Sequence, residues 1–224
     1  LMARAEEESD SGTVRLPPGR HGFSRDFVSE SQRERLLNGV VEAVVAHGYN
    51  ATTIAQLIEA AAVSRRTFYE HFADKEECFL AAYEMIGAHL AGALREAEGQ
   101  PSWPARVRAE LAALLGVFAA DPTVARFVLL ESLAAGGEVT ARHRATLRCF
   151  AGRLRPEPPA AGAGALAEAR EQALVGGIST LVARRLQAGE AARLEELLPD
   201  LHELVLTSYL GRGEGQRLAR ASAA

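Results

Sequence analysis

Apolar residues recur along this chain at the three- and four-residue spacing of buried helix faces, and no stretch alternates as a strand does. The first stripe predicts a helix over residues 31–47. Two short helices are expected over residues 54–61 and 65–71, and a long helix over residues 75–98. Five further helices are expected over residues 103–120, 122–135, 138–154, 166–188 and 190–210. The pattern therefore predicts an all-α protein.

The segment from Thr53 to Lys75 has the features of two short helices joined by a tight turn. Thr53 can cap the helix over residues 54–61, and Ser64 can cap the helix over residues 65–71, because a hydroxyl oxygen accepts from an unpaired amide of the first turn. A capped helix, a short turn and a second capped helix form a helix-turn-helix, which places its second helix in the DNA major groove.

Side chains three or four positions apart share one face of the helix over residues 65–71. Phe68 and Phe72 are therefore expected to point into the core, while Arg65 and Tyr69 face outward. An arginine near the start of a recognition helix can bond guanine O6 and N7 or hold a phosphate. The alternative is that Arg65 and its neighbour are solvated surface arginines.

This region resembles the DNA-binding domain of the TetR family of bacterial transcriptional repressors. The resemblance covers residues 32–83 and rests on VSRRTFYEHF at residues 63–72 and DKEE at residues 74–77. Ala62 departs from the pattern, because glycine usually makes the turn there. Alanine is tolerated if its φ stays negative, since a residue with a Cβ resists the left-handed conformation.

The resemblance and the residue chemistry together give a predicted set of DNA contacts. The family positions matched by Thr67 and Tyr69 touch the DNA backbone, and the Lys75 ammonium would add to the positive end of a helix dipole, which suits a phosphate. For His71, compensation of the helix dipole is an equal alternative. The predicted contact residues are Thr52, Thr53, Ser64, Arg65, Arg66, Thr67, Tyr69, His71 and Lys75.

The resemblance implies three parts: a flexible N-terminal arm at residues 1–29, the helix-turn-helix domain at 30–74, and a larger helical effector-binding and dimerisation domain at 75–224. In the family's plan, the last two long helices pair with their copies in a second subunit. Gly176 and Gly177 interrupt the first of these helices, and they indicate either the close approach of another backbone or a kink.

The implied function is ligand-responsive regulation of transcription, in which a homodimer binds a palindromic double-stranded operator and an unknown small molecule releases it. Ligand control requires that the effector bind the DNA-incompetent conformation more tightly. Apolar, carboxylate and imidazole side chains of the C-terminal helices are the candidates for the pocket wall, although each apolar one could equally be core. They are Trp103, Phe118, Phe127, Leu130, Glu131, His143, Phe150 and Leu174.

Charge and composition change this picture little. The chain is 48% hydrophobic and 24% charged, as is ordinary for a soluble globular protein, and its net charge of −4 gives no sign of a nucleic-acid partner. Cys78 and Cys149 lack metal-ligand or disulfide spacing, and the longest apolar run, residues 111–120, is too short to span a bilayer. We therefore expect a cytoplasmic protein with no metal, cofactor or membrane partner.

Two other hypotheses remain open. The chain could be a DNA-binding regulator of transcription that has no effector, or it could be an all-α enzyme or small-molecule binding protein that does not bind DNA. The sequence contains no HExxH, GxSxG, Walker or GxGxxG pattern, so no catalytic residue is predicted.

Overall fold

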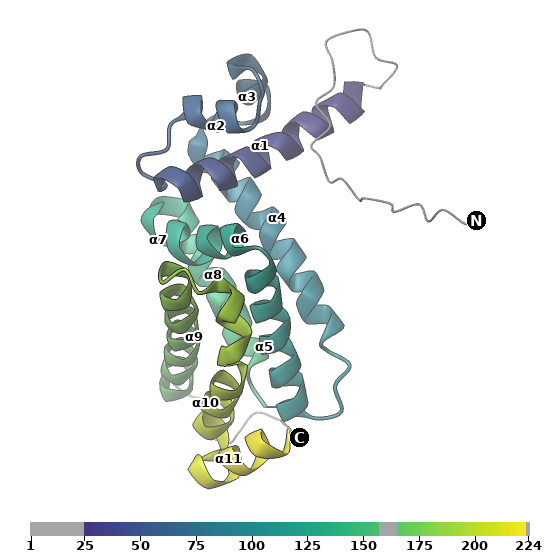
Figure 1. Ribbon diagram of the computed structural model, residues 1–224, viewed down its shortest axis with the longest axis vertical. Helices are drawn as coiled ribbons and strands as arrows, with labels where there is room; N and C mark the ends of the chain where they lie inside the picture. The colour runs from purple at the N-terminus through teal and green to yellow at the C-terminus, as the bar shows by residue number, and fades with distance from the viewer. Residues whose placement is uncertain (1–24, 157–164, 223–224) are drawn as a thin grey trace, which may run out of the picture.

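Three helices form one end of the molecule (Figure 1): α1 (Arg25–His47), α2 (Ile54–Ala60) and α3 (Arg65–His71). The computed structural model describes residues 25–156 and 165–222. The apolar stripe of α1 is buried with Leu57 of α2 and Phe68 of α3, both fully inaccessible to solvent. The bounds of these helices agree with the sequence pattern, except at the start of α1.

Helix α1 begins at Arg25, whereas the sequence pattern predicts a start at Ser31. Residues 29–35 of α1 are exposed or half-buried, so no apolar stripe marks this part of the helix. The last residues of the predicted arm are therefore helical, and the remainder of that arm, residues 1–24, lies outside the described residues.

The long helix α4 (Lys75–Glu96) leads from this end into the rest of the molecule, and Asp74 caps its first turn through the amide of Glu77. Helix α5 (Trp103–Ala120) follows, capped by Ser102. Both helices bury a continuous apolar face, so α4 contributes to the packing of both parts of the chain.

Residues 122–135 do not form the single helix that was expected. They form α6 (Pro122–Arg126), a π-helical turn η1 (Phe127–Glu131) and the short α7 (Ser132–Ala134). The hydroxyl of Ser132 donates to the carbonyl of Val128 at the end of this turn. A side chain that bonds the preceding turn competes with regular helix, which is consistent with the local irregularity.

Three longer segments complete the bundle: α8 (Gly137–Arg153), α9 (Ala165–Gln187) and α10 (Leu198–Leu210). A 3₁₀ segment, η2 (Ala191–Leu197), precedes α10, although one continuous helix was expected there. Pro199 explains the difference, because proline has no amide hydrogen and belongs in the first turn of a new helix.

Helix α9 runs unbroken through Gly176 and Gly177, so these glycines do not mark a break in the helix. A Cβ built on either glycine would meet no atom of this chain within 4 Å. Within the described residues, no other backbone therefore lies close to either glycine.

A final helix, α11 (Arg212–Ala221), was not predicted. It folds back on α10, and Gly215 makes this possible because a Cβ there would lie 2.6 Å from the Thr207 Cα. Its residues are mostly polar, so hydrophobic periodicity gave no signal.

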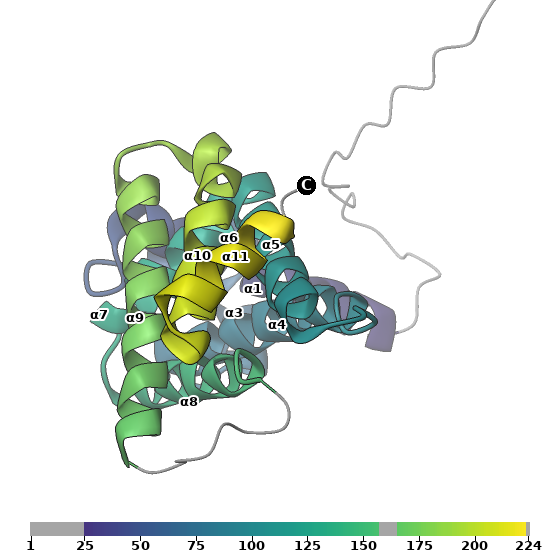
Figure 2. The ribbon, with the colours of Figure 1, turned by 90° about the horizontal axis from the view of Figure 1, so that it is seen from below.

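The described residues contain no strand, which confirms the all-α class. The molecule is elongated, with α1, α2 and α3 at one end and α11 at the other (Figure 1). Seen from below, α9 and α4 lie on opposite sides of the bundle (Figure 2). No single described helix is long and apolar enough to cross a membrane, although the bent pair Trp103–Ala120 and Pro122–Ala134 together meet the criteria of length and composition.

Candidate nucleic-acid interface

Both short helices are capped as the sequence predicts. The Thr53 hydroxyl accepts from the amide of Gln56 (3.3 Å), and the Gln56 side chain accepts in return from the Thr53 amide (2.8 Å). The Ser64 hydroxyl accepts from the Thr67 amide at 3.0 Å. These caps satisfy amides that would otherwise be unpaired, and they fix where α2 and α3 begin.

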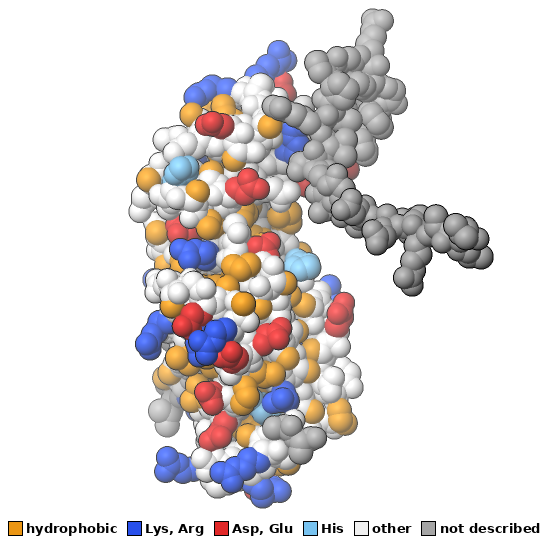
Figure 3. Space-filling view, viewed as in Figure 1, with side chains coloured by type: hydrophobic (Ala, Val, Ile, Leu, Met, Phe, Trp, Pro, Cys, Tyr) orange, Lys and Arg blue, Asp and Glu red, His pale blue; other side chains and the backbone are white. Residues whose placement is uncertain are grey.

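The two faces of α3 differ as expected. Phe68 and Phe72 are buried, whereas Arg65, Arg66 and Tyr69 are exposed, with 51% of Tyr69 accessible to solvent. Basic side chains lie at the tip of the molecule that α2 and α3 form (Figure 3). The outward face of α3 therefore presents hydrogen-bond donors suited to base edges or phosphates.

Arg66 is paired within its own helix. Its Nε donates to Glu70 at 2.8 Å, and both side chains are largely exposed. Such an exposed pair contributes about 0.3–0.5 kcal/mol, so DNA phosphates could readily replace Glu70 as the partner of Arg66. Among the described residues, Arg65 has no carboxylate within ion-pair distance, which leaves its guanidinium available.

Thr52 does not belong to this surface. It is only 3% exposed, and its hydroxyl donates to the carbonyls of Gly48 (2.8 Å) and Ala43 (3.2 Å). The prediction that this hydroxyl reaches a phosphate is therefore wrong. Thr52 instead bonds one carbonyl near the end of α1 and one in the loop that follows, so it fixes this loop against the end of the helix.

Lys75 has contacts that the sequence did not reveal. Its ammonium donates to the carbonyls of Tyr49 (2.7 Å) and Thr52 (2.9 Å) and lies 4.3 Å from the centre of the Tyr49 ring. Partial burial lowers the pKa of Lys75, and burial also raises the pKa of Tyr49. An ammonium has three donors, so one remains for the phosphate contact, which stays a prediction.

The other predicted contacts occupy the same end of the molecule. Thr53 and Ser64 are exposed, while Thr67 and His71 are half-buried. The hydroxyls of Ser64 and Thr67 lie 2.9 Å apart. Apart from Thr52, the predicted residues lie together around α3 and the N-termini of α2 and α4. Their contacts with DNA remain predictions.

The turn between α2 and α3 contains a strained residue. The sequence analysis expects alanine to be tolerated at this turn only if its φ is negative. Ala62 instead has a φ of +50°, in the left-handed region. Arg35 of α1, which the sequence analysis did not single out, donates its Nε to the Ala61 carbonyl at 3.1 Å and a second nitrogen to the Ala62 carbonyl. These bonds help hold the turn in the left-handed conformation.

Ala62→Gly is expected to raise the free energy of unfolding by roughly 1 kcal/mol. Left-handed backbone costs an L-residue about 1–2 kcal/mol, and the extra freedom of glycine in the unfolded chain offsets part of this gain. Urea denaturation of both proteins measures the difference. An unchanged or lower stability would show that the Ala62 backbone is not strained.

One carboxylate and a row of three aromatic rings connect this end to the C-terminal helices. The Tyr49 amide donates to Glu131 Oε2 in η1 at 2.9 Å. The Tyr49 ring meets Phe79 of α4 edge-on at 5.1 Å, and Phe79 stacks on Phe127 of η1 at 4.2 Å. The loop between α1 and α2, which ends at the capping residue Thr53, is thus in direct contact with η1. Residue spacing could not reveal this connection.

A buried histidine of α8 links this helix to α4 and α7. His143 Nδ1 of α8 lies 2.9 Å from the Tyr83 hydroxyl of α4 and 3.2 Å from the Ser132 hydroxyl of α7. Burial lowers the pKa of His143 and raises that of Tyr83, so both tend to be neutral. This cluster holds α4, α7 and α8 together.

The eight candidate pocket residues occupy varied positions. Phe118, Phe127 and Leu174 are buried in the core, and Leu130 and Phe150 are half-buried. His143 and Glu131 make the contacts given above. Trp103 donates to the Leu154 carbonyl at 3.2 Å and borders an open groove of about 650 Å³. None of the other seven lines that groove or the smaller hollow between α8 and α9.

The helix-turn-helix region is similar in sequence to known transcriptional regulators. Residues 36–82 match the family of bacterial regulatory proteins called the tetR family. The HTH-type transcriptional regulator TcmR of Streptomyces glaucescens is 34% identical over 87 residues, which are 39% of this chain and 38% of TcmR. The repressor AcnR of Corynebacterium glutamicum is 35% identical over 66 residues, which are 30% of this chain and 35% of AcnR. The chain thus matches under two fifths of these relatives' lengths.

Solved structures resemble the whole fold. The fatty acid degradation regulator FadR from Bacillus halodurans has a TM-score of 0.68 and 17% identity, covering 78% of this chain and 94% of its own. FadR from Bacillus subtilis, solved with stearoyl-CoA, has a TM-score of 0.66 and 15% identity, covering 80% and 98%. The match over residues 36–82, together with the capped helix-turn-helix, identifies a DNA-binding domain of the tetR family of bacterial regulatory proteins in this chain, and the solved structures show that the chain shares their fold.

Proposed function

We propose that this protein is a homodimeric transcriptional repressor that binds a palindromic operator through α3 and is released by a small molecule. The observation that carries the proposal is the outward face of α3, where Arg65, Arg66 and Tyr69 are exposed above a buried Phe68. Two such helices in a symmetric dimer would read half-sites about 34–36 Å apart.

Selection of binding sequences from random DNA, followed by gel-shift titration, tests this proposal. Arg65→Ala combined with Arg66→Ala is expected to weaken operator affinity at least tenfold, because each arginine that reads a base contributes about 1–3 kcal/mol.

Arg212→Ala combined with Arg220→Ala is the matched control. Both arginines are exposed on α11 at the opposite end of the molecule. Because two arginines are replaced in each double variant, the change in net charge is the same. Equal losses in the two double variants would contradict a reading role for α3, and selected sequences without dyad symmetry would contradict a dimer.

We propose the same division of the chain that the sequence predicts. The DNA-binding domain would extend to residue 74, and the domain for effector binding and dimerisation would begin with α4. We place the dimer interface on α9 and α10. Ala173, Thr180 and Leu181 lie on one exposed face of α9, and Leu204 of α10 is exposed. The open space at Gly177, which does not line the hollow between α8 and α9, would allow a helix of a second copy to approach closely.

Leu204→Glu is expected to convert the dimer to a monomer and to lower operator affinity, because a carboxylate would be buried without a partner at the interface. Sedimentation velocity measures the oligomeric state. Met85→Glu on α4 is the control, since Met85 and Leu204 are both 38% exposed. A dimer that persists in Leu204→Glu would remove Leu204 from the proposed interface.

The proposed small-molecule effector would bind among the C-terminal helices. A protein of the same fold, FadR of Bacillus subtilis, has been solved with stearoyl-CoA, which supports a ligand site among the C-terminal helices. A regulator without an effector is the second candidate. The observation that favours it is that Phe118, Phe127 and Leu174, three of the candidate pocket residues, are buried in the core.

A further inference from the structure

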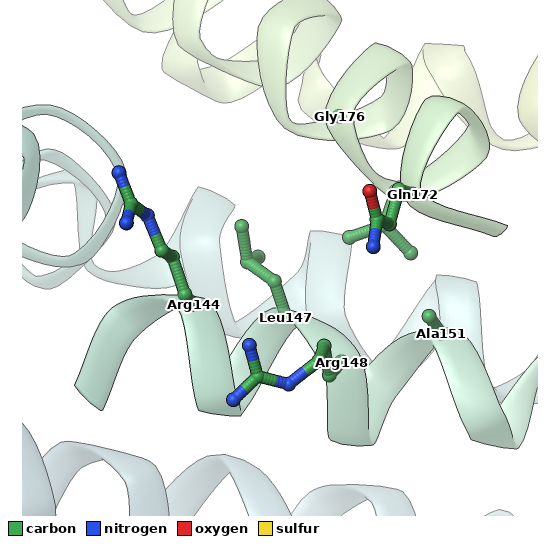
Figure 4. A pocket seen from close by; sticks show the side chains of 7 residues that line it. Arg144, Leu147, Arg148, Ala151, Gln172 and Gly176 are labelled. Atoms are coloured by element: carbon green, nitrogen blue, oxygen red, sulfur yellow. The ribbon is translucent and has the colours of Figure 1, made fainter. Parts of the chain in front are cut away.

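A hollow of about 260 Å³ lies between α8 and α9 (Figure 4). Its floor is apolar: Ala151 and Val175 are buried, and Leu147 points from α8 toward α9. Its rim carries Arg144 and Arg148 of α8. Its volume is just below the roughly 300–1,000 Å³ of pockets that hold drug-sized ligands, so its occupant would be small or partly inserted.

The two arginines at the rim differ from others on the same helix. Arg142 pairs with Glu84 at 3.0 Å, and Arg153 pairs with the buried Glu110 at 2.8 Å. Among the described residues, no carboxylate lies within ion-pair distance of Arg144 or Arg148. Because they are four positions apart, both guanidinium groups lie on one side of α8, beside the apolar floor.

The opposite wall offers a polar but uncharged group. Gln172 of α9 lines the hollow, and its amide nitrogen donates to Glu168 at 3.2 Å, one helical turn away. This bond leaves the Gln172 oxygen free as an acceptor, suited to a donor such as a protonated head group or water. The charge at the rim is therefore supplied by the arginines, while Glu168 is partly satisfied by Gln172.

We propose that this hollow binds a small amphipathic anion, with a carboxylate or phosphate head on Arg144 and Arg148 and a short apolar chain over Leu147, Ala151 and Val175. Guanidinium groups suit both heads, because their planar donors can make two parallel charge-assisted hydrogen bonds. This inference rests on the proposed function, in which a small molecule releases the repressor, and it assigns the chemical class of that molecule.

Helix α8 also provides a route from this hollow to the DNA-binding end. The Glu138 amide, at the start of α8, donates to Glu76 in the first turn of α4 at 3.2 Å. Farther along α8, His143 bonds Tyr83 of α4. A ligand that moves α8 away from α9 would therefore act on α4 through these two contacts, and α4 begins directly after α3.

Titration calorimetry of the full chain with octanoate, octyl phosphate, octanol and octylamine tests the proposal. At least one of the two anions is expected to bind saturably and at least tenfold more tightly than octanol or octylamine, because the latter two cannot pair with a guanidinium. Comparing octanoate with octyl phosphate distinguishes a carboxylate site from a phosphate site. Arg144→Gln combined with Arg148→Gln is expected to reduce affinity for the bound anion to that of octanol.

The control is Arg212→Gln combined with Arg220→Gln, which removes the same charge far from the hollow. Octanol binding as tightly as both anions, no binding of either anion, or undiminished binding by the Arg144/Arg148 variant would overturn the inference. A gel shift with the selected operator then separates the two proposals. An anion that binds through these arginines without changing operator affinity supports the site and removes its effector role.

Discussion

Gly39→Ala is expected to disrupt the packing of α1 on α2 and to abolish operator binding. A Cβ on Gly39 would lie 2.7 Å from the Ala61 nitrogen and 2.8 Å from the Ala61 Cβ. Rotation of a side chain cannot relieve this overlap, because the atoms concerned belong to the backbone and Cβ of Ala61, the residue directly after α2. The helices must separate, at a cost of about 1–3 kcal/mol for overpacking of a core contact.

Urea denaturation and gel-shift titration measure the two effects of Gly39→Ala. Displacing α2 would also displace the turn and α3, so the loss of affinity should exceed the loss expected from unfolding. Gly87→Ala is the control, because Gly87 lies in α4 and a Cβ there would meet no atom within 4 Å. That substitution should raise stability by about 1 kcal/mol, the difference in helix propensity. Similar behaviour of the two variants would contradict the proposed close contact at Gly39.

The sequence predicts the DNA-binding end accurately where local signals determine structure. The bounds of α3 match the prediction at both ends, because Ser64 caps one end and Phe72 leaves the helical conformation at the other. The burial of Phe68 follows from spacing alone. These features depend on neighbours within a few residues, and a single sequence contains that information.

Residues whose roles depend on distant partners could not be assigned in this way. Thr52 and Thr53 are adjacent hydroxyl residues, yet one is buried against the end of α1 and the other caps α2. Lys75 has the charge of a phosphate ligand, but two of its donors are used by carbonyls of a loop more than 20 positions earlier. Such roles depend on tertiary packing, which the local pattern does not contain.

The same limit applies to the aromatic residues of the C-terminal helices. A phenylalanine that walls a pocket and one that fills the core have the same helical spacing, so periodicity predicts burial without predicting what covers the ring. The structure separates them by contact: Phe127 is 0% exposed and stacks on Phe79, whereas Phe150 is half-buried.

Phe127→Ala is accordingly expected to lower the free energy of unfolding by about 3–5 kcal/mol, the usual cost of removing a fully buried aromatic ring. The loss includes the stack on Phe79 and the cavity left between η1 and α4. Because Phe79 also contacts Tyr49, the change should loosen the loop before α2 and weaken operator binding in the protein that remains folded. Urea denaturation and amide hydrogen exchange at Tyr49 measure these effects.

Phe150→Ala provides the comparison, since a half-buried ring loses less area and leaves a smaller cavity. Its stability loss should be clearly smaller, and exchange at Tyr49 should be unchanged, because Phe150 lies on α8 and not in the row of rings that reaches the loop. If Phe127→Ala were instead as stable as the parent protein and had lost affinity for a bound small molecule, Phe127 would line a ligand pocket. The connection from η1 to the DNA-binding end would then depend on the bond between Glu131 and the Tyr49 amide.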